Sequence, residues 1–453
     1  MLDALGPDAR VLAAAGALIV LPGILVVRSP WRAMPALSLA FWVLSWTWLG
    51  GAPRLRVLQI SLLAFGTLAA FRVLRPHPLP RPRGTDLALA AAAIILALPL
   101  AVHLVPAGAR LPRESVTAAL LAWRDGWPLS FEPLLSLRPF RASGLAALAG
   151  DLVLLAGAAP YRAAFVACVL GDLALLVALW SFAEIRAAPR RATTIAALAM
   201  LATVDRAGAG PSALATAFVV QAAALWYDRK GRPSAFAAGA CVAAALATDP
   251  ETGLAAMAVA VIGARILRLD RDRSVDRQPA RRRVALFAAL VLAAPLVLRW
   301  PPIVTPSAGP LLAFVVTVLL GALAARAGGR ASSIPWISAA GALLFVAAAA
   351  HAVHAAVTAD ATASTGEIAA MVWMREHTRP LDVVCAPNVA PARWIPAVAA
   401  RATDVERSEG STVAAPCAAW IALRGVAPSS APTREPPAYQ SAEARVWTTS
   451  QGR

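Results

Sequence analysis

Apolar runs of about 15 to 20 residues recur along this chain, and short arginine-rich stretches separate them. A helix needs about 20 such residues to cross the hydrocarbon core of a bilayer. Hydrophobic residues make up 59% of the 453 positions, whereas soluble proteins contain roughly 45–50%. The pattern predicts an all-α polytopic membrane protein with about 12 transmembrane helices. These spans are expected at 11–27, 34–51, 55–74, 86–105, 161–183, 193–205, 210–227, 234–248, 252–267, 284–299, 310–326 and 333–352.

The formal charge of +17 raises the question of a nucleic-acid partner. The arginines, however, lie in short loops between apolar runs, as expected for the cytoplasmic loops of a membrane protein. We therefore expect membrane lipid, and no nucleic acid, as the partner of this charge.

The side on which each loop lies depends on one further apolar stretch, 145–158. If this stretch crosses the membrane, the arginines at 186–191 face outside. If it lies flat as a juxtamembrane helix, every strong basic cluster lies inside, and we choose this topology. The segments that then lie outside the cytoplasm are the loop 106–142, the turn at Asp205, the turn 248–252 and the whole chain after Val353.

The chain divides into N-terminal transmembrane helices (1–85), a membrane core (86–352) and an extracytoplasmic tail (353–453). In the tail, Ser364 and Glu367 form the pattern of a helix capping box. Short apolar segments typical of buried strands follow this helix. The alternation predicts a small α/β domain. Its strands are expected at 382–386, 418–425 and 444–449.

The cysteines divide into two pairs by environment. Cys168 and Cys241 lie in predicted spans, where we expect them to be packing residues. Cys385 and Cys417 lie in the exported tail, each at the edge of a predicted strand. An oxidising compartment allows a disulfide between them, but the sequence does not show whether their Cα atoms come close enough.

The segment RESVTAALLAWRDGWPLSFEPLLSLRPF (113–140) is a polar interruption in the apolar pattern. An acidic residue directly after an early span precedes an amphipathic helix, a G-x-P turn and a proline-rich turn, and GAAPYRAAF (157–165) follows. This order resembles the first extracytoplasmic loop of the GT-C-fold glycosyltransferases. The segments that carry the rest of the resemblance are AGAGPSALATAFVVQAAALWYDRKGR (207–232), AFAAGACVAAALATDPETGLAAMAVAVI (235–262) and GEIAAMVWMREHTRPLDVVCAPN (366–388).

The resemblance covers about residues 86–425, and the chain departs from the family pattern within it. Glu114 stands where the loop usually begins with aspartate, and Asp249 stands where the family has the histidine of a Thr-His-Pro turn. The resemblance implies a glycosyltransferase of the bacterial inner (plasma) membrane. Its donor would be a polyprenyl-phosphate-linked sugar and its acceptor a cell-envelope glycan or protein. A divalent cation, Mg²⁺ or Mn²⁺, is the cofactor to test for.

Sugar transfer from a lipid phosphate needs a base for the acceptor hydroxyl and cations for the leaving phosphate. Glu114 is the first candidate for the catalytic base, and Asp125 is the second. A continuous helix would place both on one face but about 16 Å apart, too far to bind one metal ion together. The candidate substrate-binding residues are Arg113, Arg124 and Arg138 for phosphate, with Asp205, Asp249 and Glu251 on the same side of the membrane.

Each assignment has a structural alternative. Glu114 and Asp125 also fit solvated charges at helix ends that pair with the neighbouring arginines, and those arginines fit a belt that contacts lipid headgroups. Asp249, or Thr248 before it, also fits the cap of a helix that begins at Pro250, with Glu251 in its first turn.

Two further acidic residues lie in apolar surroundings. Asp151, in the juxtamembrane stretch, is expected to face water, whereas Asp172 lies inside a span and needs a partner or a cavity. His351 and His354 are a weak metal signal. Two rival functions remain open: a catalytically inactive relative of the same fold whose tail binds a partner or glycan, and a transporter, although matching halves with broken spans are not visible.

Overall fold

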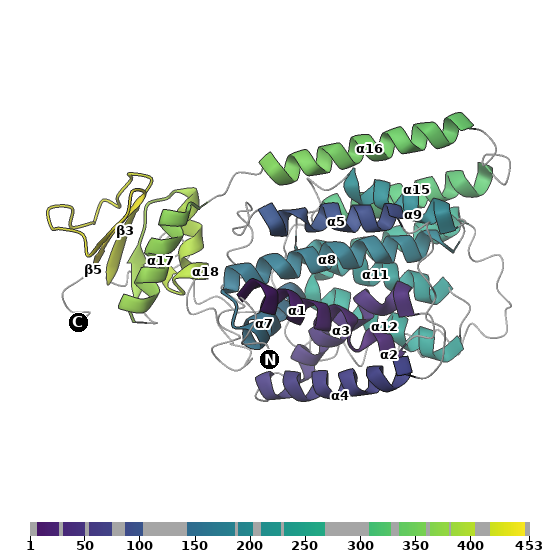
Figure 1. Cartoon of the computed structure of the whole chain (residues 1–453), viewed down its shortest axis with the longest axis horizontal. Coiled ribbons are helices and arrows are strands. Elements are labelled where there is room, and N and C mark those ends of the chain that lie inside the picture. Colours follow the sequence, from purple (N-terminus) through teal and green to yellow (C-terminus); the bar gives the residue numbers. More distant parts are fainter. Residues whose placement is uncertain are drawn as a thin grey trace.

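The protein consists of a large helical bundle and a small C-terminal α/β domain that lies at one end of it (Figure 1). The computed structural model describes residues 7–26, 30–49, 54–74, 87–102, 143–185, 189–202, 210–227, 231–267, 308–327, 335–358, 363–379, 382–403 and 417–448.

The predicted spans coincide with helices of the bundle, except that 284–299 lies outside the described residues. Pro22 divides the first of them into two helices. By length and composition, α8 is the one described helix that is both long and apolar enough to cross a membrane, with 24 residues and a hydropathy of 2.3. The helices are α1 (Pro7–Val20), α2 (Gly23–Val26), α3 (Pro30–Leu49), α4 (Arg54–Leu74), α5 (Leu87–Val102), α7 (Gly144–Ala156), α8 (Pro160–Ala183), α9 (Pro189–Leu201), α11 (Pro211–Tyr227), α12 (Gly231–Thr248), α13 (Pro250–Ile266), α15 (Ala308–Ala327) and α16 (Pro335–Thr358).

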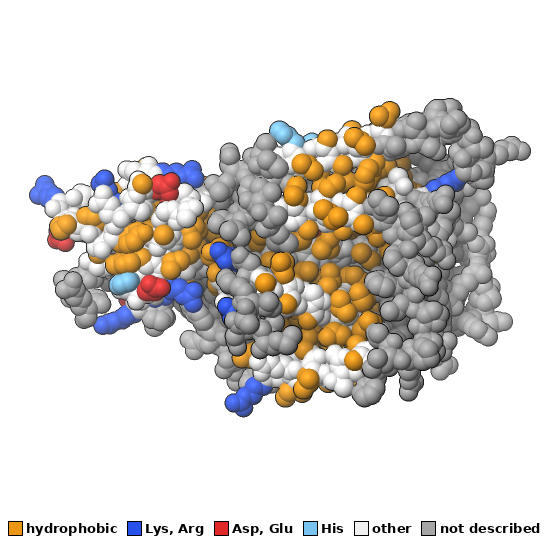
Figure 2. All heavy atoms as spheres, in the orientation of Figure 1, with side chains coloured by type: hydrophobic (Ala, Val, Ile, Leu, Met, Phe, Trp, Pro, Cys, Tyr) orange, Lys and Arg blue, Asp and Glu red, His pale blue; other side chains and the backbone are white. Residues whose placement is uncertain are grey.

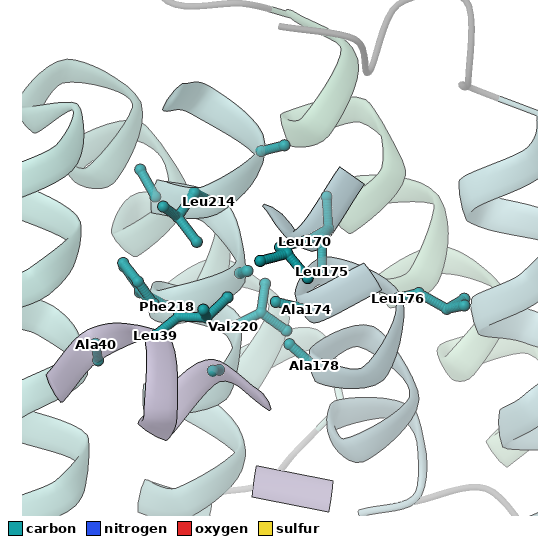
Figure 3. Close-up of a cluster of buried hydrophobic side chains, with 14 of the residues drawn as sticks. Leu39, Ala40, Leu170, Ala174, Leu175, Leu176, Ala178, Leu214, Phe218 and Val220 are labelled. Carbon is teal, nitrogen blue, oxygen red and sulfur yellow. The ribbon is translucent and has the colours of Figure 1, made fainter. Parts of the chain in front are cut away.

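Most of the core of the bundle is one large cluster of buried side chains, rich in alanine, that includes residues from α1 and α3 as well as from the later helices. Small side chains allow helix backbones to approach closely. Figure 3 shows Leu170 and Ala174 of α8 beside Leu214 and Phe218 of α11, with Leu39 of α3 against them. The N-terminal helices therefore share one core with the rest of the bundle.

A buried ion pair connects α4 to α7. The guanidinium of Arg54 donates from Nε to Asp151 Oδ1 over 3.0 Å and from Nη2 to Oδ2 over 3.1 Å. Trp46 Nε1 also donates to Oδ1, over 2.9 Å, and the indole ring of Trp46 lies 4.5 Å from the guanidinium carbon. Arg54 and Asp151 are 1% and 0% exposed. The prediction that Asp151 faces water was therefore wrong, because its partner comes from 97 residues earlier in the chain.

Helix α7 is short and buried. Its 13 residues rise about 20 Å, which is less than the ~30 Å hydrocarbon core of a bilayer. Residues Gly144 to Leu152 are buried by neighbouring helices, so α7 packs inside one end of the bundle instead of lying on an exposed surface.

The tail forms the predicted α/β domain, with the strand order β2-β1-β3-β5-β4. Strand β1 pairs in parallel with β2 and β3, and β5 pairs antiparallel with β3 and β4. The capping box of Ser364 and Glu367 is present at the start of α17, as predicted. The elements are α17 (Thr365–His377), β1 (Val383–Cys385), the 3₁₀ helix η5 (Ala390–Trp394), α18 (Ile395–Val398), β2 (Ala402–Thr403), β3 (Ala419–Leu423), β4 (Tyr439–Gln440) and β5 (Ala444–Thr448).

A disulfide joins Cys385, at the end of β1, to Cys417, just before β3, with the Cα atoms 5.6 Å apart. This settles the pairing that the sequence left open. It closes a segment of 32 residues, and such a loop stabilises a domain by about 3–4 kcal/mol in the chain-entropy account. Cys168 and Cys241 form no disulfide and are buried in the bundle, which agrees with their predicted role in packing.

The tail domain docks on the N-terminal end of α8. Tyr161, the second residue of α8, is buried in the apolar core of the tail domain together with Trp394 and Ile395. The rings of Tyr161 and Trp394 meet edge to face, with centroids 6.4 Å apart. The end of the bundle at which α8 begins is therefore the end that carries the tail (Figure 1).

We predict that Asp151→Leu lowers the midpoint of thermal unfolding strongly, because loss of one partner leaves the Arg54 charge buried and unpaired. Such a loss typically costs about 3–5 kcal/mol. The double variant Arg54→Met/Asp151→Leu is the control and is expected to recover most of the midpoint, since it removes both charges. Differential scanning fluorimetry of the detergent-solubilised protein measures both variants. An unchanged midpoint in Asp151→Leu alone would show that the pair does not hold α7.

Candidate functional site

Two of the predicted site residues, Asp249 and Glu251, lie in the part of the chain that the structure describes. The others lie outside the described residues, so their roles stay predictions. These are Glu114, Asp125, Arg113, Arg124, Arg138 and Asp205.

Three helices begin close together around Asp249. Ser212, in the first turn of α11, donates to Asp249 Oδ2 over 2.8 Å, and Asp249 itself precedes α13. Gly144, the first residue of α7, leaves no room for a Cβ beside Thr248 Oγ1. The N-termini of α7, α11 and α13 therefore meet at one junction, which we call the three-helix junction.

Gly210 completes the junction. Its φ of +43° lies in the left-handed region, where glycine is favoured. A Cβ at Gly210 would also lie 2.8 Å from Leu145 Cδ2 and 3.4 Å from Cys168 Sγ, so a larger residue would push α11 away from α7 and α8. Gly210 and the start of α11 thus lie close to the turn 248–252.

Asp249 uses both carboxylate oxygens in hydrogen bonds. Oδ1 accepts from the backbone N–H of Thr252 over 3.1 Å, and Oδ2 accepts from the hydroxyls of Ser212 and Thr252 over 2.8 and 2.7 Å. Asp249 is 9% exposed, and it is the N-cap of α13, with Pro250 next and Glu251 in the first turn. The predicted capping role is confirmed. Because its oxygens are occupied, Asp249 is a positioning residue in this structure.

The positive ends of three helix dipoles meet at the junction. Each helix N-terminus carries about half a positive charge from its unsatisfied N–H groups. Ser143 caps α7 by accepting from the N–H of Ala146 over 3.2 Å, but this cap is neutral. In the described part of the junction, the carboxylates of Asp249 and Glu251 lie at the positive ends of these helices.

The junction lies below the level at which the tail docks. Cys168 and Gly171 of α8 border Gly210 and Leu214 at the start of α11. These residues follow the start of α8 by about two to three helical turns, which corresponds to roughly 12–17 Å. The polar segment 113–140 leads into the junction along the chain, because Ser143 follows it closely.

Sequence reasoning missed three polar residues of this junction: Ser143, Ser212 and Thr252. The available signal was a serine or threonine at the start of each apolar run, next to proline or glycine. As to metals, the described residues contain no group of three or more His, Cys, Asp and Glu side chains that could hold an ion. His351 and His354 are exposed in α16, and the divalent cation stays a prediction.

Comparison of the chain with models of known protein families, with characterised proteins and with solved structures gave no match. The function is therefore inferred from the residues of this chain and from their arrangement.

We predict that Asp249→Ala lowers the unfolding midpoint, because it removes the cap of α13 and leaves the hydroxyl of Ser212 without its acceptor. The expected loss is about 2 kcal/mol. Asp249→Asn should retain most of the stability, since asparagine is also a good N-cap. Glu251→Ala, in the first turn of the same helix, is the matched control and should cost less than about 1 kcal/mol. Equal effects of Asp249→Ala and Glu251→Ala, measured by thermal unfolding, would contradict the positioning role.

Proposed function

We propose that this protein is a glycosyltransferase embedded in the bacterial inner membrane. It moves a sugar from a polyprenyl-phosphate donor to a cell-envelope glycan or protein on the extracytoplasmic side. The order of segments that resembles the GT-C-fold enzymes suggests this reaction, and three features of the structure support it.

The surface of the bundle supports a position inside a bilayer. Large apolar side chains are widely exposed on it, up to 73% at Leu63 and 71% at Leu343. Figure 2 shows hydrophobic side chains spread over the middle of the bundle on the face in view. Soluble monomers rarely expose continuous apolar areas of this kind, whereas lipid chains cover them without cost. Further residues of this surface are Leu12, Ile60, Leu68, Ile94, Phe236, Leu254, Val261, Ile262, Leu319, Leu344 and Val346.

The disulfide supports the orientation. Disulfides persist in oxidising compartments and are rare in the cytosol, so the Cys385–Cys417 bond suits a tail on the extracytoplasmic side. Because the tail docks on the start of α8 through Tyr161, the half of the bundle that holds the three-helix junction would lie toward the outside with it.

The observation that carries the proposal is the meeting of three helix N-termini at the three-helix junction. In the transfer, an acceptor oxygen attacks the anomeric carbon in a single inverting displacement, and the bond from that carbon to the phosphate oxygen breaks. Negative charge develops on the leaving polyprenyl phosphate. Fixed N–H groups and helix dipoles stabilise such charge without rearranging during the reaction.

The acceptor hydroxyl must lose a proton to a base during the same step. Asp249 does not suit this task, because its two oxygens already accept hydrogen bonds from Ser212 and Thr252. We therefore assign the base to Glu114, with Asp125 second, in the segment that precedes Ser143. Arg113, Arg124 and Arg138 of the same segment would add donors for the phosphate.

We predict that Glu114→Gln lowers the transfer rate by about 10²–10⁴-fold, because glutamine keeps the size of the side chain but cannot take a proton. The assay measures transfer of a radiolabelled sugar from polyprenyl-phosphate hexoses and pentoses to membrane acceptors. Glu132→Gln, the same chemical change in the same segment, is the control and should keep the wild-type rate. Full activity of Glu114→Gln would contradict the assignment of the base. A wild-type protein inactive with every donor would favour the catalytically inactive relative.

A further inference from the structure

Asp172 is a carboxylic acid in the middle of α8. It is the thirteenth of 24 residues in the helix that is long and apolar enough to cross a membrane. Its Oδ1 atom is buried, and no hydrogen bond reaches it. The side chain as a whole is partly exposed, so it is not sealed inside the bundle. From the sequence, this carboxyl was expected to have a hydrogen-bond partner or a cavity, and the described residues supply no such partner.

The position of Asp172 places it beside the three-helix junction. Its neighbour Gly171 borders the start of α11, where a Cβ would lie 3.8 Å from the carbonyl oxygen of Gly210. Cys168, four residues earlier and therefore on nearly the same face of α8, also borders Gly210. Asp172 thus lies within one helical turn of the residues that form the junction.

Two other carboxylates inside the bundle each have hydrogen-bond partners within the protein. Asp151 accepts from Arg54 and Trp46, and Asp249 accepts from Ser212 and Thr252. An unpaired carboxyl in apolar surroundings destabilises a protein, and ionisable residues within membrane spans commonly serve binding or transport. This contrast indicates that the hydrogen-bond partner of Asp172 is a bound ligand.

We propose that Asp172 binds a hydroxyl group of the lipid-linked sugar. The identity of this ligand rests on the proposed function. A carboxylate repels the phosphate of the donor but accepts hydrogen bonds from sugar hydroxyls. The helix N-termini of the three-helix junction attract the phosphate. The two features would therefore hold the two ends of the sugar phosphate headgroup, with Asp172 selecting lipids that carry a sugar.

The stability of variants tests whether Asp172 is unpaired in the free protein. Asp172→Asn and Asp172→Leu should leave the midpoint of thermal unfolding unchanged or raise it, because they remove a carboxyl that has no partner. The matched control is Asp151→Asn, which weakens a satisfied ion pair and should lower the midpoint. If the unfolding midpoint of Asp172→Asn falls as much as that of Asp151→Asn, Asp172 has a structural partner and the proposal is overturned.

Ligand-induced stabilisation tests the binding itself without requiring catalysis. Two probes are compared by thermal unfolding: undecaprenyl phosphate, and undecaprenyl phosphate linked to a hexose or a pentose. In the wild type, the sugar-linked lipid should raise the midpoint more than the bare lipid phosphate at equal concentration. In Asp172→Asn, this difference should disappear, while the shift caused by the bare lipid phosphate remains.

The outcomes separate the two proposals. A hydrogen bond to a charged group corresponds to roughly a 10- to 100-fold change in affinity, so the difference is measurable in a titration. A difference between the two lipids that persists in Asp172→Asn overturns the role of Asp172 and leaves the proposed function standing. Absence of any shift by either lipid in the wild type contradicts the proposed function, and the role of Asp172 with it.

Discussion

The hydrogen bonds to one buried carboxylate, Asp249, hold together the part of the molecule on which its function would depend. Asp249 accepts from Ser212 of α11 and from Thr252 of α13, so it fixes the starts of two helices against each other. Gly144 packs against Thr248, so the start of α7 comes to the same place. A site for a charged headgroup needs fixed dipoles. Here the dipoles of three helices are fixed by the same few contacts that cap them.

Three carboxylates inside the bundle differ in their hydrogen-bond partners, and this difference distinguishes structural roles from a proposed binding role. Asp151 is neutralised by Arg54 and joins α7 to α3 and α4, which is a structural role. Asp249 is satisfied by hydroxyl and N–H groups and positions helix ends. Asp172 has no partner among the described residues, although an unpaired group is the most costly of the three.

Much of the fold follows from local signals in the sequence. Apolar runs predicted the helices, and the Ser364–Glu367 box and the short apolar segments predicted the start of α17 and the strands of the tail. The cap at Asp249 was also visible, because a Thr-Asp-Pro-Glu pattern is a local signal. Contacts between distant segments were not visible. Arg54 and Asp151 are 97 residues apart in the sequence, and the contact of Tyr161 with Trp394 joins two domains. The hydrophobic periodicity of a single segment therefore could not predict either contact. The predicted resemblance also stays untested, since no comparison matched the chain.

We infer that the bundle spans a membrane, with the tail at its extracytoplasmic end and the three-helix junction inside the half of the bundle that is nearer to the tail. Cysteine accessibility tests it directly. Arg434 is exposed in the tail, and Arg265 is exposed in the last turn of α13, at the end of that helix opposite Asp249. In intact cells, a membrane-impermeant maleimide should label Arg434→Cys at once and Arg265→Cys only after the membrane is permeabilised. Labelling of both variants in intact cells, or of Arg434→Cys only after permeabilisation, would contradict the account.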